Sequence, residues 1–326
     1  MNRFLCLLAA GVLPAFASAS DLDLSIESGG QNSLTVSPGQ LVAFDVVGEL
    51  TDSLNEGLAL FSIDLNMPGV TLTPLAAPTS AAMLNFASPL GLNNPAGFGG
   101  TQSRAALKQV GGMQNTLNNS FAPKPSGTVM TGLAQPGAAE TLASGMVLAP
   151  TQSGTYTLSA SNVLANVIRQ GESGSPTWMV DAAGVGANTP LTVTVESLSQ
   201  STNTVSLAAG GTVNFSLDGG LGAAGLPYLM LGSVTGTIPG FWVDGLKVNL
   251  TYDAFTTFMI SNPNKAPYAN TFGAFDAFGL ASASINVPAG FLPGLAGSTI
   301  NHSYIVFGAG GTIVQTSNAT SIDLLP

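Results

Sequence analysis

A glycine-rich segment of the chain matches the fingerprint of a dinucleotide-binding loop. Gly220–Gly225 reads Gly-Leu-Gly-Ala-Ala-Gly, and the acidic residue Asp244 follows at about the spacing that such sites require. A functional fingerprint opens a helix, because the helix N-terminus binds the pyrophosphate. Here Pro227 and an apolar run typical of a strand follow instead. We therefore expect a flexible loop between two strands, with no nucleotide site.

His302 is the only histidine of the chain, and it lies between Asn301 and Ser303 at the start of an apolar run. One histidine cannot build a multi-histidine metal centre. A Ser-His-Asp triad would also require a nucleophile-elbow sequence, which the chain lacks. We expect a surface or loop histidine without a catalytic role.

Carboxylates are the remaining residues that could support an enzyme, since a glycosidase needs two of them at a fixed separation. Most precede turn residues or stand on the hydrated face of a strand, and Asp276 is expected to anchor a turn. The candidates are Asp45, Asp64, Glu172, Asp181, Asp253 and Asp276. We expect no catalytic residue and no enzyme, and a carboxylate-dependent glycoside hydrolase is kept only as a minor alternative.

Calcium is a further possibility, because oxygen-rich loops of secreted β-domains bind hard cations. Asp45, Asp52, Glu56 and Asp64 are close in sequence, but the chain has no Asp-x-Asp-x-Asp-Gly loop. We expect solvated carboxylates and no cofactor, with calcium as the alternative.

Aromatic residues provide the one candidate ligand surface, because exposed rings stack on the flat faces of sugars. Phe241, Trp242 and Tyr252 are close in sequence, and Trp178 stands apart. The alternative is burial in the core, which is common for Trp and Phe at strand edges.

The elements that carry these residues are expected to be almost all strands. Residues 21–26 alternate apolar and polar side chains, which is the pattern of a half-buried strand. Between residues 76 and 128 the alternation disappears, and only Ser103–Val110 has the composition of a short helix, so we expect an irregular insertion near 76–128. The other expected strands of the first half are Gln40–Val47, Ala59–Met67, Val70–Leu75, Gly154–Ala160, Val163–Ile168 and Leu191–Val195.

In the second half, prolines and glycines separate the apolar runs, where a missing amide donor does not interrupt a ladder. The polar segment Glu196–Asn203 is expected to be a linker. The expected strands are Thr204–Ala208, Thr212–Leu217, Tyr228–Val234, Leu246–Leu250, Ala254–Ile260, Ala281–Val287, Ser303–Phe307 and Ser321–Leu324. The pattern predicts an all-β chain of two consecutive β-sandwich, jelly-roll-like domains, at 20–198 and 199–326.

Residues 1–19 have the features of a secretory signal peptide. Arg3 precedes an apolar run, and Ala17-Ser18-Ala19 supplies the small residues of a cleavage site. We expect cleavage after Ala19, with Ala17 as the alternative, and a secreted protein of the extracellular space or cell surface. The only cysteine, Cys6, lies in the removed segment, so no disulfide or thiolate metal site is expected.

Charge is scarce, with 7 basic and 17 acidic residues in 326. So few cations cannot follow a phosphate backbone, which excludes a nucleic-acid partner. No later segment offers the roughly 18 uninterrupted apolar residues of a membrane span. The hydrophobic content of 45% is enough to drive folding in spite of the many glycines.

The first half resembles the opening of a cohesin-like domain, over about residues 21–197. The stretches that carry the resemblance are Val36–Gln40, Phe44–Val46, Asn55–Gly57, Leu60–Leu65 and Ser153–Leu158. This resemblance implies a β-sandwich similar to carbohydrate-binding modules, which engages a partner. Residues 204–326 resemble a β-module that recurs on secreted bacterial proteins, through Leu207–Thr212, Leu226–Leu229 and Ser317–Ala319. No chemistry is implied by that module.

The sequence therefore predicts a secreted, non-catalytic binding or scaffold protein of the bacterial cell surface or extracellular space. It is expected to engage an extracellular protein or a polysaccharide. A purely structural component of the surface or matrix is the alternative.

Overall fold

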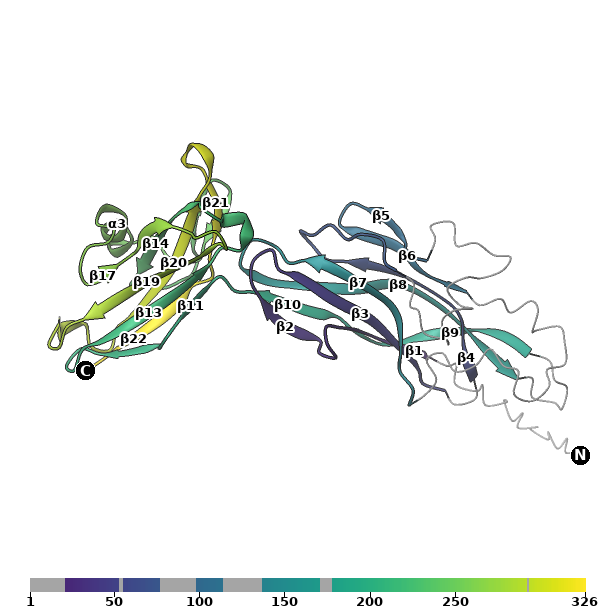
Figure 1. Ribbon diagram of the computed structural model, residues 1–326. Coiled ribbons are helices and arrows are strands. Elements are labelled where there is room, and N and C mark those ends of the chain that lie inside the picture. The colour runs from purple at the N-terminus through teal and green to yellow at the C-terminus, as the bar shows by residue number, and fades with distance from the viewer. Residues whose placement is uncertain (1–20, 53–54, 77–97, 114–136, 171–177, 292) are drawn as a thin grey trace, which may run out of the picture.

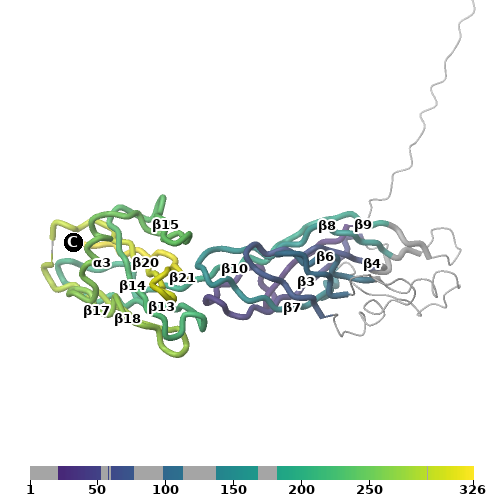
Figure 2. Tube along the Cα trace, turned by 90° about the horizontal axis from the view of Figure 1, so that it is seen from above, coloured from purple at the N-terminus to yellow at the C-terminus, as the bar shows by residue number. Residues whose placement is uncertain are grey.

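The computed structural model describes residues 21–52, 55–76, 98–113, 137–170, 178–291 and 293–326. The expected signal peptide and most of the expected insertion lie outside these residues. The chain forms two β-rich halves that lie end to end, and the C-terminus lies at the outer end of the second half (Figures 1 and 2). The prediction of an all-β fold is confirmed.

The first half contains the strands β1 to β10. Their bounds are β1 Asp21–Glu27, β2 Ser33–Val36, β3 Leu41–Leu50, β4 Asn55–Asn66, β5 Thr101–Ser103, β6 Ala106–Met113, β7 Glu140–Leu148, β8 Gly154–Gln170, β9 Trp178–Thr189 and β10 Leu191–Val195. The sheet order is β5-β6-β4-β8-β9-β1-β3-β7, and β10 pairs with both β8 and β2. The 17-residue β8 thus contacts β4, β9 and β10, so the sheet curls around one core.

Alternation of side chains fills this core. In β1, Leu22, Leu24 and Ile26 are buried while their neighbours are half-buried, as the period-two pattern predicts. In β4, Phe61, Ile63 and Leu65 are buried in the same core. Each such side chain stabilises the fold by about 1.5–3 kcal/mol relative to an exposed one.

The helix expected at Ser103–Val110 is wrong, because the structure has a hairpin of β5 and β6 there. Arg104 begins the connecting turn with a φ of 58°. Leu107 and Val110 are both buried and lie three residues apart, which is the spacing of a helix face. In the structure a bulge produces this spacing: Gln109 has a φ of 58° and shifts the register against β4.

Three other predictions for the first half need correction. The expected strand Val70–Leu75 does not form a ladder, because no strand in the described part of the chain pairs with it, although Val70 and Leu72 are buried. The expected strands Gly154–Ala160 and Val163–Ile168 form the single strand β8, in which Asn162 has a φ of 49°. The strands β2, β7 and β9 were not predicted.

The second half contains the strands β11 to β22, one α-helix and three 3-10 turns. Their bounds are β11 Leu198–Gln200, β12 Thr204–Ser206, β13 Gly211–Asp218, η1 Leu221–Ala223, β14 Pro227–Ser233, β15 Phe241–Val243, β16 Leu246–Val248, α3 Ala254–Ser261, β17 Tyr268–Ala269, β18 Phe272–Ala274, β19 Leu280–Val287, η2 Pro293–Leu295, β20 Thr299–Phe307, η3 Ala309–Gly311, β21 Ile313–Thr316 and β22 Thr320–Leu325.

Two sheets enclose the core of this half. One has the order β11-β13-β19-β17, and the other has the order β12-β22-β20-β14-β18 with β21 beside β20. Phe215 and Ile285 from the first sheet and Tyr304 from the second pack in one buried cluster. A second, smaller cluster lies behind β14 and β20, where the separate hairpin of β15 and β16 packs.

The strand expected at Ala254–Ile260 is wrong, because α3 occupies this segment. Its Phe, Thr and Ile residues favour strands by composition, but its first residues form a capping box. The Asp253 Oδ1 accepts a hydrogen bond from the Thr256 amide at 2.8 Å, and the Asp253 amide donates to the Thr256 Oγ1 at 3.3 Å. The cap satisfies amides that a helix start leaves unpaired, so the local sequence begins a helix.

The segment Glu196–Asn203 is more than the polar linker expected from the sequence. It contains β11, and Ser197 and Leu198 are buried. Asn318, which comes from between β21 and β22, accepts hydrogen bonds from the Ser197 and Leu198 amides at 2.9 and 3.0 Å. A contact of this kind between distant segments fixes the path of the chain between the halves.

Direct hydrogen bonds also join the two halves. The Ser37 hydroxyl donates to the Asp218 Oδ2 at 2.5 Å, and the Thr316 amide donates to the Gln152 Oε1 at 3.1 Å. A groove of about 490 Å³ runs along this junction, with Ser37, Glu196 and Asp218 among its lining residues. The halves therefore meet at a defined polar junction.

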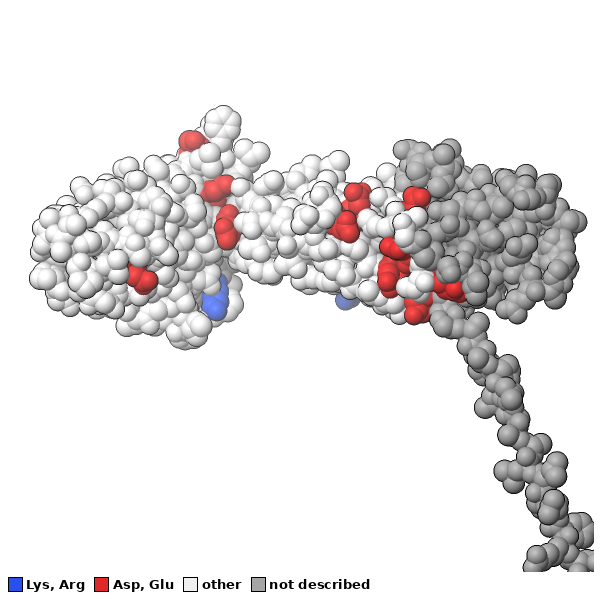
Figure 3. Space-filling view, turned by 90° about the horizontal axis from the view of Figure 1, so that it is seen from below, with Lys and Arg blue, Asp and Glu red and all other residues white. Residues whose placement is uncertain are grey.

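Acidic side chains outnumber basic ones on the face of the molecule in Figure 3. In the first half, Asp23 lies opposite Glu49 and Glu27 lies opposite Asp45 across the β1–β3 ladder. In the described part of the chain, no helix is both long enough and apolar enough to cross a membrane.

Candidate functional site

The hairpin of β15 and β16 carries the aromatic residues selected from the sequence. Its register pairs Phe241 with Val248, Trp242 with Lys247 and Val243 with Leu246. Asp244 and Gly245 form the turn with φ values of 51° and 81°, which match the two left-handed positions of a type I′ turn. The Asp-Gly pair between apolar residues therefore causes the hairpin. Figure 2 shows β15 projecting from the side of the second half.

The two faces of the hairpin have different roles. Phe241, Val243 and Leu246 pack against the small cluster behind β14 and β20. Because neighbouring residues of a strand face opposite sides, Trp242 projects outward, with Lys247 opposite it on the same face. The Trp242 side chain is 69% exposed. The hairpin thus uses its inner face for anchoring and presents an indole on its outer face.

Tyr252 lies beside the hairpin and is 55% exposed. Its ring meets Phe241 edge-to-face, with centroids 5.4 Å apart and planes at 88°. The Thr257 hydroxyl donates to the Tyr252 hydroxyl at 3.2 Å. The inward-facing Phe241 therefore supports Tyr252 and does not form an exposed platform with Trp242.

Two aliphatic residues that the sequence analysis did not select lie on the segment before the hairpin. Ile238 is 84% exposed and Val234 is 47% exposed. Thr251 holds this segment: its hydroxyl donates to the Ile238 carbonyl at 2.9 Å, and its amide donates to the Gly236 carbonyl at 2.8 Å. We call Val234, Ile238, Trp242 and Tyr252 together the hairpin surface.

Asp253 forms hydrogen bonds with the segment that carries Val234 of the hairpin surface. Its Oδ2 accepts hydrogen bonds from the Val234 amide at 2.8 Å, from the Ser233 hydroxyl at 2.9 Å and from the Thr235 amide at 3.1 Å. Its Oδ1 caps α3 through Thr256. Burial acts to raise the pKa of Asp253, but these hydrogen bonds stabilise the carboxylate and lower its pKa to about 2. Asp253 is thus a structural carboxylate.

The hairpin is also tied to the rest of the second half. The Ile313 amide donates to the Asp244 Oδ2 at 2.7 Å, and the Thr316 hydroxyl donates to the Lys247 carbonyl at 2.9 Å. Thr316 in turn donates its amide to Gln152 of the first half. The hairpin is therefore held by hydrogen bonds at its turn and on β16.

The structure brings Phe241, Trp242 and Tyr252 together, while the side chain of Trp178 lies outside the described residues. The strand β15 itself was missed by the sequence analysis. The signal that could have found it is the Asp244-Gly245 pair, which strongly favours a two-residue hairpin turn.

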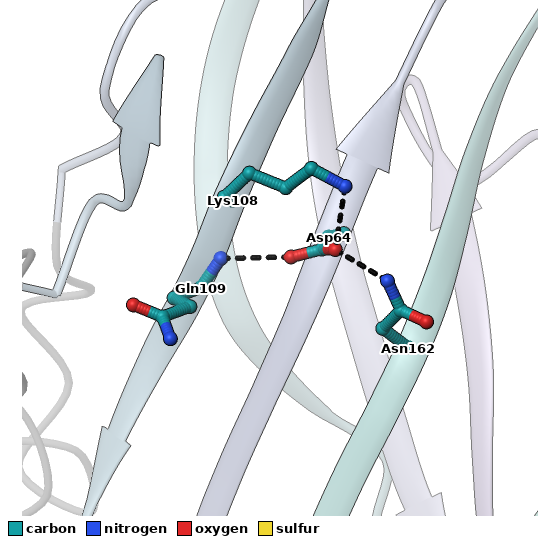
Figure 4. A network of polar contacts seen from close by, with 4 residues as sticks. All are labelled: Asp64, Lys108, Gln109 and Asn162. Carbon is teal, nitrogen blue, oxygen red and sulfur yellow. Dashed lines mark hydrogen bonds and ion pairs between the residues drawn. The ribbon is translucent and has the colours of Figure 1, made fainter. Parts of the chain in front are cut away.

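Asp64, a candidate for calcium and for catalysis, is engaged in a local network (Figure 4). It accepts hydrogen bonds from the Lys108 ammonium at 2.8 Å, the Gln109 amide at 2.9 Å and the Asn162 amide side chain at 2.6 Å. Burial acts to raise the pKa of Asp64, but these three partners lower it below its usual value. Its donors come from β6 and β8, so Asp64 joins the strands on either side of β4.

The other candidate carboxylates are dispersed. Asp45 accepts a hydrogen bond from the Ser144 hydroxyl at 2.6 Å, and Asp276 accepts from the Phe278 and Leu280 amides, as expected for a turn anchor. The side chains of Glu56 and Asp181, and all of Glu172, lie outside the described residues. Among the described residues, no group of three or more acidic, His or Cys side chains is placed to hold a metal.

His302 is not the surface histidine expected from the sequence, because it is fully buried in β20. It shares a strand face with Ile300 and Tyr304, and its ring lies 4.9 Å from that of Phe215. Its Nε2 is 3.2 Å from the Tyr268 hydroxyl. Burial lowers the pKa of His302 to about 3, so the ring is neutral at physiological pH.

The Gly220–Gly225 segment forms the short turn η1 and then leads into β14. The expected strand is therefore present where a nucleotide site would need a helix. The segment is more constrained than the flexible loop expected, since Gly220 has a φ of 69° and lies directly against the Pro38 carbonyl of the first half.

No family model and no curated protein matches the chain. Solved structures match with low similarity. A type I cohesin from Pseudobacteroides cellulosolvens is 12% identical, with 54% of this chain and 92% of that chain covered at a TM-score of 0.33. A cohesin of Acetivibrio cellulolyticus scaffoldin B, solved in complex with a dockerin, is 16% identical, with 54% and 99% covered at a TM-score of 0.30.

A putative membrane-anchored protein from Corynebacterium diphtheriae matches over more of the chain. It is 12% identical, with 94% of this chain and 57% of that chain covered at a TM-score of 0.31. Cohesins are among the matches, as the resemblance of residues 21–197 implies, but the identities and TM-scores are low. Membership of that family stays a prediction.

Proposed function

We propose that this chain is a non-catalytic binding protein of the bacterial cell exterior and that the hairpin surface contacts a protein partner. The observation that carries the proposal is the position of Trp242, which is 69% exposed on a hairpin that hydrogen bonds hold at its turn and on β16. Trp and Tyr dominate the binding energy of protein interfaces. A hairpin that is already held in place also loses little conformational entropy when it binds.

The geometry favours a protein over a polysaccharide. Stacking on a sugar face is best served by rings that share a face, and Trp242 and Phe241 lie on opposite faces of the hairpin. The exposed neighbour Ile238 adds an aliphatic side chain, which suits the apolar centre of a protein interface.

Capture from an extract of the native cell envelope tests this proposal. The immobilised chain from Ser20 onward, its Trp242→Ala variant and a Phe278→Ala variant would be compared. Phe278 is a matched control, because it is also an aromatic residue that is 69% exposed. The proposal expects a protein that the parent and Phe278→Ala retain and that Trp242→Ala loses. Equal capture by all three would contradict it. Binding confined to a polysaccharide panel would replace the protein partner with a sugar.

A specific observation also favours the second candidate function, a structural component that assembles with itself. Leu41, Met146 and Leu148 are 55%, 59% and 61% exposed, and Leu41 lies directly opposite Leu148 in the β3–β7 ladder. β7 ends the strand order of its sheet, with a single bridge from Ser144 to Ala76 beyond it, and exposed apolar residues at a sheet edge promote pairing between chains. Sedimentation over a range of concentrations tests this candidate: self-association that Leu148→Lys abolishes would support it, and a monomer at all concentrations would reject it.

A further inference from the structure

An apolar pocket opens at the end of the second half, and Trp242 is not among its lining residues. It has a volume of about 360 Å³. The helix α3 and β17 border it, and both lie toward the outer end of the second half in Figure 1. Its lining includes Phe255, Phe258, Ala266, Tyr268, Ile285 and Leu295.

The lining of the pocket carries no charged side chain. Its one side-chain polar group is the Tyr268 hydroxyl, which already has a partner in His302 Nε2 at 3.2 Å. Burial raises the pKa of Tyr268 and lowers that of His302 to about 3, so both groups are uncharged at neutral pH. The part of a ligand that enters the pocket is therefore hydrocarbon.

The volume sets the size of that hydrocarbon. With roughly 30 Å³ for a water-sized group, a space of 360 Å³ holds on the order of a dozen carbon atoms. This is within the usual range of small-molecule sites, which bury most of their ligand in an apolar cleft. A single chain of about twelve carbons fits this space.

A basic residue precedes the pocket lining in the sequence. Lys265 is exposed and directly precedes the lining residue Ala266. Its ammonium donates to the Asn262 Oδ1 at 3.3 Å and forms no ion pair with another described residue. An uncharged cavity whose lining directly follows an exposed lysine in the sequence is complementary to a molecule with an apolar chain and an anionic head.

We propose that this pocket binds the hydrocarbon chain of an anionic single-chain amphiphile, such as a fatty acid, with the carboxylate directed to Lys265. The hydrocarbon chain of the ligand is buried between α3 and the ends of the two sheets. The head group stays at the surface, where the ammonium of Lys265 attracts it.

A displacement assay tests the proposal. The fluorescent fatty acid cis-parinaric acid is bound first and is then displaced by dodecanoate or by dodecan-1-ol, with each ligand kept below its critical micelle concentration. Ala266→Trp places a large ring at an exposed lining position, and Ala269→Trp is the matched control at an exposed position outside the lining. We expect saturable binding that Ala266→Trp weakens by about tenfold or more and that Ala269→Trp leaves within about twofold. If Ala266→Trp does not fold by circular dichroism, Leu295→Trp tests the same point from another part of the lining.

The variant Lys265→Gln distinguishes the contribution of the ligand's head group to binding from that of its hydrocarbon chain. It should weaken the binding of dodecanoate several-fold and leave the binding of dodecan-1-ol unchanged. Absence of saturable binding to the parent, or equal affinity of the parent and Ala266→Trp, would overturn the proposal. If Lys265→Gln changes the affinity for dodecanoate and for dodecan-1-ol equally, the assigned position of the head group is overturned. Trp242→Ala should bind dodecanoate like the parent, so failure here is distinguishable from failure of the proposed function.

Discussion

Gly220 of the second half packs directly against the carbonyl oxygen of Pro38 in the first half. Its φ of 69° lies in the left-handed region, and a Cβ at this position would overlap that carbonyl. The same strand-to-turn segment carries Asp218, which accepts a hydrogen bond from Ser37. The glycine-rich segment that resembles a nucleotide-binding loop is therefore part of the junction between the halves.

Gly220→Ala should destabilise the protein by about 1–3 kcal/mol, because it adds both backbone strain and a clash with a backbone atom. Gly222→Ala is the matched control, since a Cβ there would meet no atom within 4 Å. Chemical unfolding of both variants checks this, and we expect Gly222→Ala within about 0.5 kcal/mol of the parent. Equal stability of the two variants would show that the Pro38 contact does not constrain the chain.

Burial of His302 makes stability depend on pH. The pKa of His302 is about 3 in the folded state against an ordinary value of 6.5 in solvent, so between these values the unfolded chain binds a proton that the folded chain does not. Stability is therefore unaffected by His302 above about pH 6.5 and falls as the pH drops toward 3. At pH 5 the loss amounts to about 2 kcal/mol.

Urea unfolding of the parent and of His302→Gln at pH 7 and pH 5 measures this contribution. The variant should be less stable at both values, but its loss between pH 7 and pH 5 should be smaller than that of the parent. An identical loss in both proteins would mean that His302 is not the group that titrates.

Asp253 offers a way to loosen the hairpin surface without removing any of its exposed side chains. Asp253→Asn keeps an oxygen that can cap α3 through Thr256, but its amide nitrogen cannot accept the hydrogen bonds of Ser233, Val234 and Thr235. We expect a loss of about 1–3 kcal/mol in stability and weaker binding of the partner.

The sign of its pH dependence follows from the lowered pKa. The pKa of Asp253 is about 2 in the folded state against an ordinary value of 3.8 in solvent, so its contribution to stability is present above about pH 4 and is lost as the pH falls toward 2. The stability difference between parent and Asp253→Asn should therefore shrink in acid. A difference that grows below pH 4 would contradict this assignment.

The like charges across the β1–β3 ladder should weaken it. Asp23 lies directly opposite Glu49, and the Glu49 Oε1 accepts a hydrogen bond from the Gly137 amide. Glu49→Gln keeps that acceptor and removes the repulsion, so it should stabilise the protein by about 0.2–1 kcal/mol. Thermal unfolding at low salt and at 1 M salt provides the measurement, with the gain expected to disappear at high salt. A gain that salt does not reduce would exclude an electrostatic origin.

Strands were predictable where one strand face is polar and the other is buried. β1 and β10 match the expected segments closely, because Leu22, Leu24, Leu191 and Val193 alternate with polar residues. The β5–β6 hairpin was not predictable from alternation, because the bulge at Gln109 gives Leu107 and Val110 the spacing of a helix face. The helix α3 depends on a cap at Asp253 that outweighs the β-rich composition after it.

The candidate site was predictable in part. Trp242 and Tyr252 were selected as aromatic residues, but their separation from Phe241 follows from the hairpin, whose register comes from the Asp244-Gly245 turn. His302 was misplaced because its neighbours Asn301 and Ser303 are polar. In the structure β20 is central to its sheet and buried on both faces, so even its polar residues are buried.

The most direct test of the central claim is a calorimetric titration of the captured protein partner into the parent, Trp242→Ala and Phe278→Ala. The proposed function predicts that Trp242→Ala loses about 2 kcal/mol or more of binding free energy. Phe278→Ala should stay within about 0.5 kcal/mol of the parent, and both variants should keep the melting temperature of the parent. Unchanged affinity of a folded Trp242→Ala variant would contradict the claim that the hairpin surface is the binding site.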